Sequence, residues 1–419
     1  MIGLVRRLLS RKRHLKWVMA DQILVSGCNF AIGILYARAL GPAGFGTYAL
    51  ITAAQLYLVS VSVSLIGNPM ITTAVHVEDA GDQRKLIERS FAAQLILSAG
   101  LAFVAALGMS IYLFAGATGI SPLAVVGLAA SSFGFSLLEW YRRLCFLRRD
   151  GPSLFRFDAF AYPSIVIAAV GLTQYGWFTL DMAVSLWGLS SAAACTYAAY
   201  RLRMPYRLVG ARAFMERHWR ASRDFIVSFQ AQWLGSQGIL YLAAPMIGAS
   251  GIGAYRSIAG LLGFTNAIGT TLDNMLPIRF AEAYRKGGNP ALRKYSVRFG
   301  LALISLLVLL MLPIGIYAEV IVAFLLGDAY VAYANILWVQ GILVVIVFAN
   351  RIAIYHERAR LNTRRIALSA LLGTAASIIL VVSTSTALGP IGVAWSTALG
   401  GAFSLLYLCV GIFRDTRKV

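Results

Sequence analysis

Two arginines stand inside long apolar stretches of the sequence, Arg38 and Arg256. A charged side chain in hydrocarbon costs about 2.5–3.5 kcal/mol on membrane-insertion scales, so such a residue usually has a function. A guanidinium group donates two parallel hydrogen bonds to the oxygens of a phosphate or carboxylate. Both arginines are therefore candidate anion-binding residues. Arg38 is close to the end of its apolar stretch, and the alternative for it is that the side chain extends to the membrane surface.

Polar residues recur at helical spacing around these arginines. Steps of three and four residues place Arg256, Asn266, Thr270 and Asp273 on one face of a helix over 252–277. At 1.5 Å per residue that face is about 25 Å long, nearly the depth of the hydrocarbon core. Three further stretches, which begin near residues 17, 44 and 224, carry similar polar faces. Their members are Gln22, Ser26, Asn29, Tyr36, Tyr48, Thr52, Gln55, Ser228, Gln232 and Ser236.

These polar faces allow two interpretations. They line a cavity that binds a polar ligand, or they hydrogen-bond neighbouring helices to one another. The sequence offers little for other chemistry: its four cysteines and four histidines show no metal-ligand spacing, and no HExxH, GxSxG or GxxxxGK[ST] motif occurs. We therefore expect no metal, no cofactor, no direct use of ATP and no enzymatic activity.

The composition predicts the elements that hold these residues. Of the 419 residues, 59% are hydrophobic and 13% are charged, and Lys and Arg outnumber Asp and Glu by 37 to 17. The apolar residues form blocks of about 20, the length that crosses a hydrocarbon core of about 30 Å. This profile predicts a polytopic membrane protein, and it excludes a soluble enzyme or a nucleic-acid-binding domain.

Twelve blocks are long enough to be transmembrane helices, which predicts an all-α fold. They cover residues 17–40, 44–66, 90–114, 120–141, 157–174, 178–200, 224–247, 252–277, 299–317, 330–350, 366–384 and 389–412. The N-terminus, every second connection and the C-terminus together hold 35 of the 37 Lys and Arg. The positive-inside rule then places both termini in the cytoplasm of a bacterial inner membrane. Only Arg38 and Arg256 are left without an explanation by orientation.

Acidic residues are rare in the predicted helices. Asp21 and Asp273 lie toward the cytoplasmic ends of theirs. They either bind a coupling proton or sodium ion, or they pair with loop arginines to close a cytoplasmic gate. Glu139 lies one turn before Arg143, so we expect a local ion pair between these two residues.

The predicted domains follow from the spans. Residues 1–16 form a basic cytoplasmic N-terminus, 17–202 an N-lobe of six helices, 203–223 a linker, 224–413 a C-lobe of six helices, and 414–419 a cytoplasmic tail. The linker is too polar to span, and it mixes aromatic residues with several arginines. We expect it to be amphipathic and to lie on the anionic inner leaflet, in contact with membrane lipids.

A short internal repeat relates the two lobes. The segment GPAGFGTY from Gly41 to Tyr48 recurs as GASGIGAY from Gly248 to Tyr255, a shift of 207 residues. Each copy follows the first helix of a six-helix lobe, so both lobes enter the membrane in the same orientation. A parallel repeat of this kind predicts a cavity between two lobes, where alternating access can operate. Tight turns and close helix contacts also require glycines, whatever the substrate.

The first copy of the repeat carries a family resemblance. The sequence ARALGPAGFGTYAL, residues 37–50, resembles the first helix hairpin of the Wzx-type polysaccharide flippases of the multidrug/oligosaccharidyl-lipid/polysaccharide (MOP) exporter superfamily. The resemblance implies a V-shaped MOP/MATE-like fold with six helices in each of two lobes. It also implies transport of an undecaprenyl-diphosphate-linked oligosaccharide from the cytoplasmic to the periplasmic leaflet, for O-antigen, capsule or exopolysaccharide synthesis.

In such a flippase, the uncharged polar faces would bind sugar hydroxyls, and Arg256 and Arg38 would bind the diphosphate. The expected partners are the polyprenyl-diphosphate-linked glycan, membrane lipids, and the polymerase and glycosyltransferases of the same pathway. We expect no nucleic-acid partner, and we expect a monomer.

Two other functions fit a polytopic chain. A drug or organic-cation antiporter needs an acidic cavity, whereas the predicted face carries Arg256 at mid to outer depth and acids only near its inner end. A membrane enzyme, such as a polyprenyl-glycan polymerase or glycosyltransferase, usually displays acids, His or Arg on long periplasmic loops. The longest such connection, about 317–330, offers only Glu319 and Asp328. The sequence therefore favours a flippase with an anionic substrate.

Overall fold

The computed structural model describes residues 2–116, 120–202 and 208–416. Helices joined by short turns make up these ranges, and no strand occurs within them. The helices are α1 (Ile2–Ser62), α2 (Asn68–Ala74), α3 (Ala80–Phe114), α4 (Pro122–Arg148), α5 (Gly151–Gln174), α6 (Leu180–Leu202), α7 (Ala211–Trp233), α8 (Ile239–Leu261), α9 (Phe264–Ile316), α10 (Ala318–Leu326), α11 (Asn335–Ala359), α12 (Thr363–Leu388) and α13 (Pro390–Thr416). Two π-helical turns, η1 (Val63–Gly67) and η2 (Leu234–Gly238), and a 3₁₀ turn, η3 (Asp328–Tyr333), join some of them. The predicted all-α fold is confirmed.

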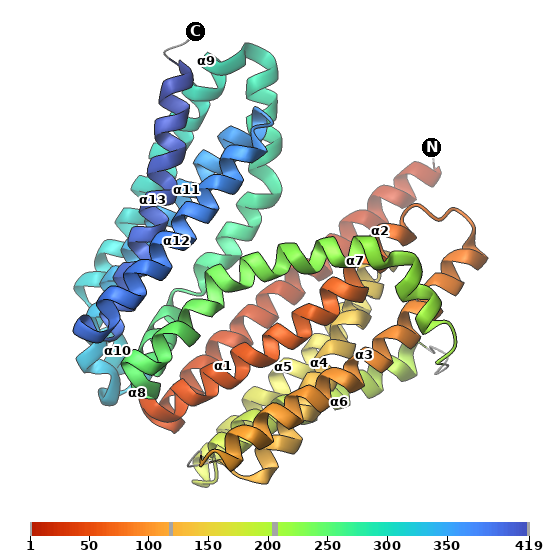
Figure 1. Ribbon diagram of the computed structural model, residues 1–419. Helices are drawn as coiled ribbons and strands as arrows, with labels where there is room; N and C mark the ends of the chain where they lie inside the picture. Colours follow the sequence, from red (N-terminus) through yellow and green to blue (C-terminus); the bar gives the residue numbers. More distant parts are fainter. Residues whose placement is uncertain (1, 117–119, 203–207, 417–419) are drawn as a thin grey trace. The chain divides into compact units, whose positions relative to one another are not determined.

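The chain folds as two compact units. Unit 1 comprises Met1–Leu40 and Tyr48–Gln237, and unit 2 comprises Gly41–Thr47 and Gly238–Val419. In unit 1, α3, α4, α5 and α6 run side by side around a core rich in aromatic side chains (Figure 1). In unit 2, α11 packs against α9 and α13, and α12 packs against α13.

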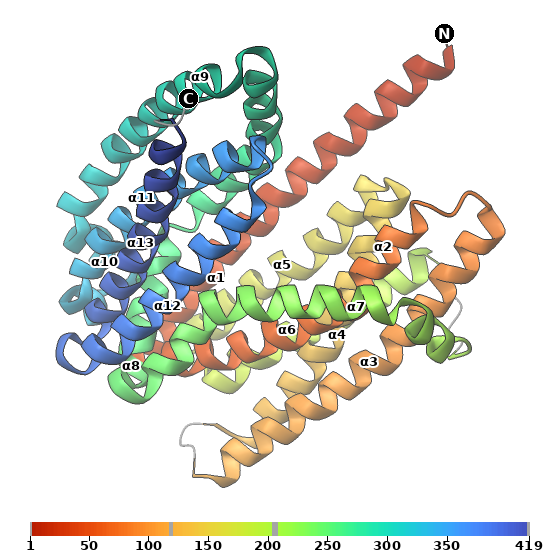
Figure 2. The same cartoon turned by 45° about the horizontal axis from the view of Figure 1, so that its top comes forward.

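Eight helices in the described ranges are long and apolar enough to cross a membrane. Two of them are bent, and each is long enough for two spans: Lys16–Ala74 bends at Gly41, and Phe264–Ile316 bends at Gly287 and Gly288. Figure 2 shows how α9 changes direction at its bend. The chain is thus a multi-pass membrane protein, and the count of twelve spans stays a prediction.

The predicted helix over 252–277 is divided between two helices. The first, α8, ends at Leu261, and α9 begins at Phe264. The amides of Leu262 and Gly263 donate to carbonyls only three residues back, which is the 3₁₀ pattern that ends an α-helix. The helical periodicity of the sequence does not reveal this break.

The predicted linker, 203–223, is described from Leu208 onward. From Ala211 onward it is helical, and it continues into the predicted span 224–247 because α7 contains parts of both. Residues 203–207 lie outside the described ranges. The amphipathic segment is therefore the first half of a longer helix.

The two copies of the repeat share an unusual backbone geometry. Gly41 has φ 65° and ψ 177°, and Gly248 has φ 68° and ψ 176°. This region of conformational space is open almost only to glycine. Gly41 bends α1, and Gly248 bends α8. The two copies of the repeat are therefore alike in backbone conformation as well as in sequence.

A second pair of glycines brings the two copies together within unit 2. A methyl group on Gly46 would lie 1.8 Å from the carbonyl oxygen of Ala249, and one on Gly253 would lie 1.8 Å from that of Pro42. Pro42 and Ala249 occupy equivalent positions in the repeat, so the two contacts are reciprocal. The backbones approach this closely only because both glycines lack a side chain.

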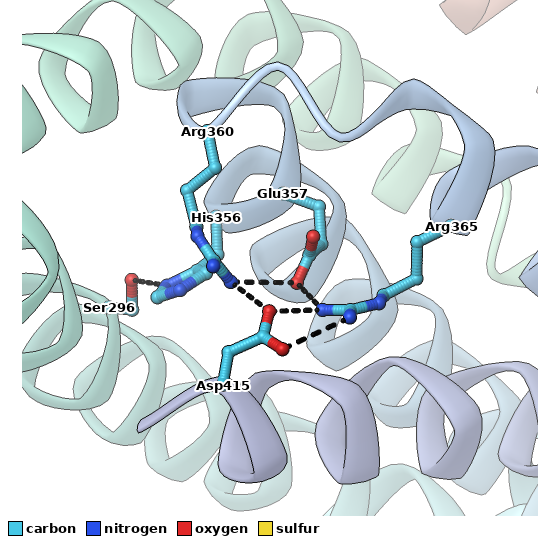
Figure 3. Close-up of polar contacts among 6 residues, drawn as sticks. All are labelled: Ser296, His356, Glu357, Arg360, Arg365 and Asp415. Atoms are coloured by element: carbon cyan, nitrogen blue, oxygen red, sulfur yellow. Dashed lines mark hydrogen bonds and ion pairs between the residues drawn. The ribbon is translucent and has the colours of Figure 1, made fainter. Parts of the chain in front are cut away.

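An ion-pair cluster joins the ends of α11, α12 and α13 (Figure 3). Arg365 donates hydrogen bonds to Asp415 at 2.9 Å and to the buried Glu357 at 3.0 Å. Beside this cluster, His356 hydrogen-bonds to Ser296 of α9 at 2.9 Å. The cluster neutralises a buried carboxylate and connects three helices of unit 2, and the His356–Ser296 hydrogen bond adds α9 to them.

The reciprocal glycine contact predicts that substitution by alanine has different effects on stability at two glycines of α8. Gly253→Ala should lower the free energy of unfolding by at least about 1–3 kcal/mol, because the new methyl group must displace a backbone segment. Gly260→Ala is the control: nothing lies within 4 Å of that position, so alanine should be neutral or should stabilise the helix by up to about 1 kcal/mol. Thermal unfolding in detergent measures both, and equal melting temperatures would contradict the contact.

Candidate functional site

Arg256 lies on the part of α8 that follows the bend at Gly248, and its side chain is half-buried. The next residue, Ser257, is buried and donates to the carbonyl of Gly253 at 2.7 Å. Tyr330 of η3 is also buried, and its side chain lies beside Ser257. These contacts fix the turn of α8 that carries Arg256. The backbone at this residue is therefore held in place next to the repeat.

The other residues of the predicted Arg256 face lie on α9. Asn266, Thr270 and Asp273 are exposed, and the Thr270 hydroxyl donates to the Asn266 carbonyl at 2.9 Å. The 3₁₀ break at Leu262 separates these three residues from Arg256. The structure therefore places the predicted face on two helices of unit 2.

Asp273 pairs with residues of α11. Its carboxylate accepts hydrogen bonds from Arg351 and from the hydroxyl of Tyr355. Gly269, one turn earlier on α9, makes room for this contact, because a methyl group there would lie 2.9 Å from the Arg351 guanidinium. The ion pair lies within unit 2, and a role for Asp273 in a gate or in ion coupling stays a prediction.

The polar face predicted on the first helix divides between the surface and the core of unit 1. Gln22 and Asn29 are exposed, and the Gln22 side chain donates to the Ser26 hydroxyl at 3.2 Å. Tyr36 is fully buried and packs edge-on against Tyr48, with 5.0 Å between the ring centroids. Tyr36 is thus a core residue.

The remaining predicted residues have different surroundings. Arg38, near the bend of α1, is exposed, whereas Gln55 on the second half of α1 is buried. Gln232 belongs to α7, and its side chain lies outside the part of the chain that is described, as do those of Ser228 and Ser236.

Unit 1 contains a cluster of buried charges, to which the sequence analysis assigned only Asp21. Asp21 of α1 and Asp158 of α5 are buried, and both pair with Arg142 of α4. The guanidinium lies 3.1 Å from Asp158, 3.7 Å from Asp21 and 2.7 Å from Glu139. The sequence predicts Arg143 as the partner of Glu139, and this is wrong: the partner is Arg142.

Three carboxyl groups share one guanidinium in this cluster. Asp21 and Asp158 both lie within 4 Å of this guanidinium, and both are buried. The three acids outnumber the one cation of the cluster.

The sequence allows Asp21 and Asp273 to pair with loop arginines, but it does not identify Arg142 and Arg351 as those partners or Asp158 as a member of the cluster. Their partners lie on other helices, so sequence spacing gives no signal for the contacts; the one available signal was an acid, Asp158, at the start of an apolar stretch. Within the described ranges, no group of three or more His, Cys, Asp or Glu is arranged to hold a metal ion.

Comparison with known proteins identifies the fold. No protein-family model matches the chain, and a search of curated proteins finds no significant match. The lipid II flippase MurJ, in an inward closed conformation, matches with a TM-score of 0.72 and 12% identity, over 95% of this chain and 87% of its own. An inward-facing multidrug resistance MATE transporter of the MOP superfamily matches with a TM-score of 0.70 and 14% identity, over 95% of this chain and 94% of its own. The chain has the MOP exporter fold.

A third similar structure agrees with this result. The eukaryotic MATE transporter AtDTX14 has a TM-score of 0.58 and 12% identity, and the match covers 97% of this chain and 96% of that one. The predicted MOP/MATE-like fold class is therefore confirmed.

The buried cluster of unit 1 predicts a strong interaction between two substitutions. Arg142→Met should lower the free energy of unfolding by about 3–5 kcal/mol, because it leaves buried acids without a cation. Asp158→Asn in the same chain should restore part of this loss, because it removes one of those acids. Arg212→Met, at an exposed position of α7, is the control and should change stability by less than about 1 kcal/mol. Additive effects of Arg142→Met and Asp158→Asn would contradict the cluster.

Proposed function

We propose that this MOP-fold protein is a flippase that moves a polyprenyl-diphosphate-linked oligosaccharide from the cytoplasmic to the periplasmic leaflet by alternating access. The product would serve surface polysaccharide synthesis, as in the Wzx-type flippases that residues 37–50 resemble. The fold supports this proposal, because one of the similar structures is named as a lipid II flippase. The protein would lie in the inner membrane with both termini in the cytoplasm, as the distribution of basic residues predicts.

The observation that carries the proposal is the position of Arg256. Its side chain is half-buried on α8, directly after the repeat segment Gly248–Tyr255. A guanidinium is permanently charged and binds two oxygens at once, which matches a diphosphate better than a cationic ligand. The exposed polar residues Asn266 and Thr270 on α9 would bind sugar hydroxyls.

The membrane potential favours outward movement of this substrate. An inside-negative potential is worth about 2.3 kcal/mol per charge per 100 mV, so two diphosphate charges gain about 4–5 kcal/mol. This energy is available without ATP, in keeping with the absence of a P-loop motif from the sequence.

The Asp21–Asp158 pair would couple transport to protons. It is buried beside Arg142, and one proton shared by the two carboxyl groups would reduce the negative charge of the cluster. A change of conformation that separates the two carboxyl groups would release that proton, because each could then ionise against Arg142. Proton movement inward could thus accompany substrate movement outward.

An organic-cation antiporter is the second candidate function. Two of the similar structures are MATE transporters, and the acids of unit 1 are a feature that a cationic drug could use. Those acids are already paired with Arg142, whereas the charged residue of α8 is Arg256. The charges therefore favour an anionic substrate.

Substitution of Arg256 tests the substrate class. In proteoliposomes with a fluorescent polyprenyl-diphosphate-linked oligosaccharide, Arg256→Ala should slow translocation at least about 10-fold, because a bidentate, charge-assisted contact is lost. Arg256→Lys keeps the positive charge but cannot donate two parallel hydrogen bonds, so its translocation rate should be intermediate. The accessibility of the label to a membrane-impermeant reductant measures translocation.

The control for this experiment is Arg298→Ala, at an exposed position of α9, which should translocate at the wild-type rate. A wild-type rate for Arg256→Ala would contradict the proposal. Transport of ethidium by the wild type, with no movement of the lipid-linked glycan, would support the antiporter instead.

A pH gradient tests the coupling. An outside-acid gradient should accelerate outward translocation by the wild type, because protons moving inward drive it. Asp158→Asn should translocate at one rate with or without the gradient, since an amide at this position cannot take up or release the proton. Acceleration of equal size in Asp158→Asn would show that the proton is carried elsewhere, while the Arg256 result would still stand.

A further inference from the structure

A concave, basic pocket lies in unit 1, and neither Asp21 nor Asp158 lines it. It is a cavity of about 310 Å³ between the end of α2, the start of α3 and the first half of α7. Its charged lining residues are Asp82, Lys85, Arg89, Arg217 and His218. The predicted orientation of the chain places it on the cytoplasmic side, since it lies among the basic connections 67–89 and 201–223.

Positive charge exceeds negative charge in this pocket. Lys85 pairs with Asp82 at 3.0 Å, which neutralises the acid. Within the part of the chain that is described, neither Arg89 nor Arg217 forms an ion pair. Two guanidinium groups, one from α3 and one from α7, therefore remain available to an anion.

The walls of the pocket are held in place by buried contacts. Phe214 and His218 of α7 are both buried and stack with 4.5 Å between their ring centroids. The Ser222 hydroxyl, one turn further along α7, donates to the carbonyl of Leu65 at 2.8 Å and fixes α7 against η1. The two arginines thus project from helices that are already in position, which lowers the entropy lost on binding.

One glycine keeps Arg89 beside α7. Gly210, just before α7, has φ 88°, and a methyl group on it would lie 2.6 Å from Cγ of Arg89. The stem of Arg89 therefore packs directly over the backbone that leads into α7. The glycine allows this approach because it has no side chain.

Apolar side chains next to the pocket indicate a membrane surface. Leu208, Val209 and Trp219 are 62%, 80% and 53% exposed, although they stand among arginines. Exposed aliphatic and indole groups beside basic residues are typical of segments that lie at the headgroup level of an anionic bilayer. A pocket with two available guanidinium groups at this level suits a phosphate that carries acyl chains.

We propose that this pocket binds the phosphate of an anionic phospholipid of the adjacent leaflet, with Arg89 and Arg217 as its main ligands and Lys85 at its edge. A lipid bound there holds the first half of α7 against α2 and α3, and α7 leads through η2 into α8, which carries Arg256. The site is independent of the transported substrate, so it stands whether or not the protein is a glycan flippase.

Native mass spectrometry of the detergent-solubilised full chain tests the site, with dioctanoyl phosphatidylglycerol as the probe. The pocket variant is Arg89→Gln with Arg217→Gln, and the control is Arg84→Gln with Arg220→Gln, which removes the same charges from exposed positions of the same two helices. We expect the pocket variant to lose affinity for the probe about 10-fold or more and the control to lose less than about 2-fold. Dioctanoyl phosphatidylcholine should bind weakly to all three proteins.

Competition by inorganic phosphate distinguishes the two sources of a phosphate group. Displacement of the lipid only at phosphate concentrations far above that of the lipid supports a lipid site. Displacement at equal concentration, with the same loss in the pocket variant, overturns the lipid assignment in favour of a soluble phosphate ligand. Equal affinity of the wild type, pocket variant and control for phosphatidylglycerol overturns the site itself.

Discussion

A charge enclosed by apolar helices must be neutralised, because its desolvation costs more free energy than most other contacts return. This constraint explains much of the polar architecture. In unit 1, Arg142 pairs with acids from three helices. In unit 2, the cluster around Glu357 neutralises that buried carboxylate where the ends of α11, α12 and α13 meet. Each of these groups lies within one unit, so each unit satisfies its own buried charges.

Close contact between backbones is the second feature that holds the helices together. The reciprocal approach of Gly46 to Ala249 and of Gly253 to Pro42 replaces side-chain packing with direct contact between two bent helices. Arg256 and Ser257 follow this segment directly on α8, and Ser257 donates to the carbonyl of Gly253 within it. The glycines are thus part of the scaffold that positions the arginine, and the repeat has a structural reason independent of any substrate.

Local patterns in the sequence were sufficient to predict the all-α membrane fold, the bend at each copy of the repeat and the amphipathic start of α7. They were insufficient where a feature depends on distant residues. The basic residues Arg142 and Arg351 were explained by membrane orientation, yet both serve as partners of acids on other helices. The sequence pattern does not reveal the break at Leu262, because a single 3₁₀ turn leaves the spacing of polar residues nearly unchanged. Tyr36 shared the spacing of a polar face but its ring is buried in the core.

The proposed function depends on the sign of the charge on the ligand that the protein binds. Equilibrium binding of the purified full chain to a polyprenyl diphosphate and to the uncharged polyprenol of equal length isolates that charge. The account predicts at least about 10-fold tighter binding of the diphosphate, and it predicts that Arg256→Ala removes most of this difference. Equal affinity for the two lipids, or a difference that Arg256→Ala leaves intact, would contradict it.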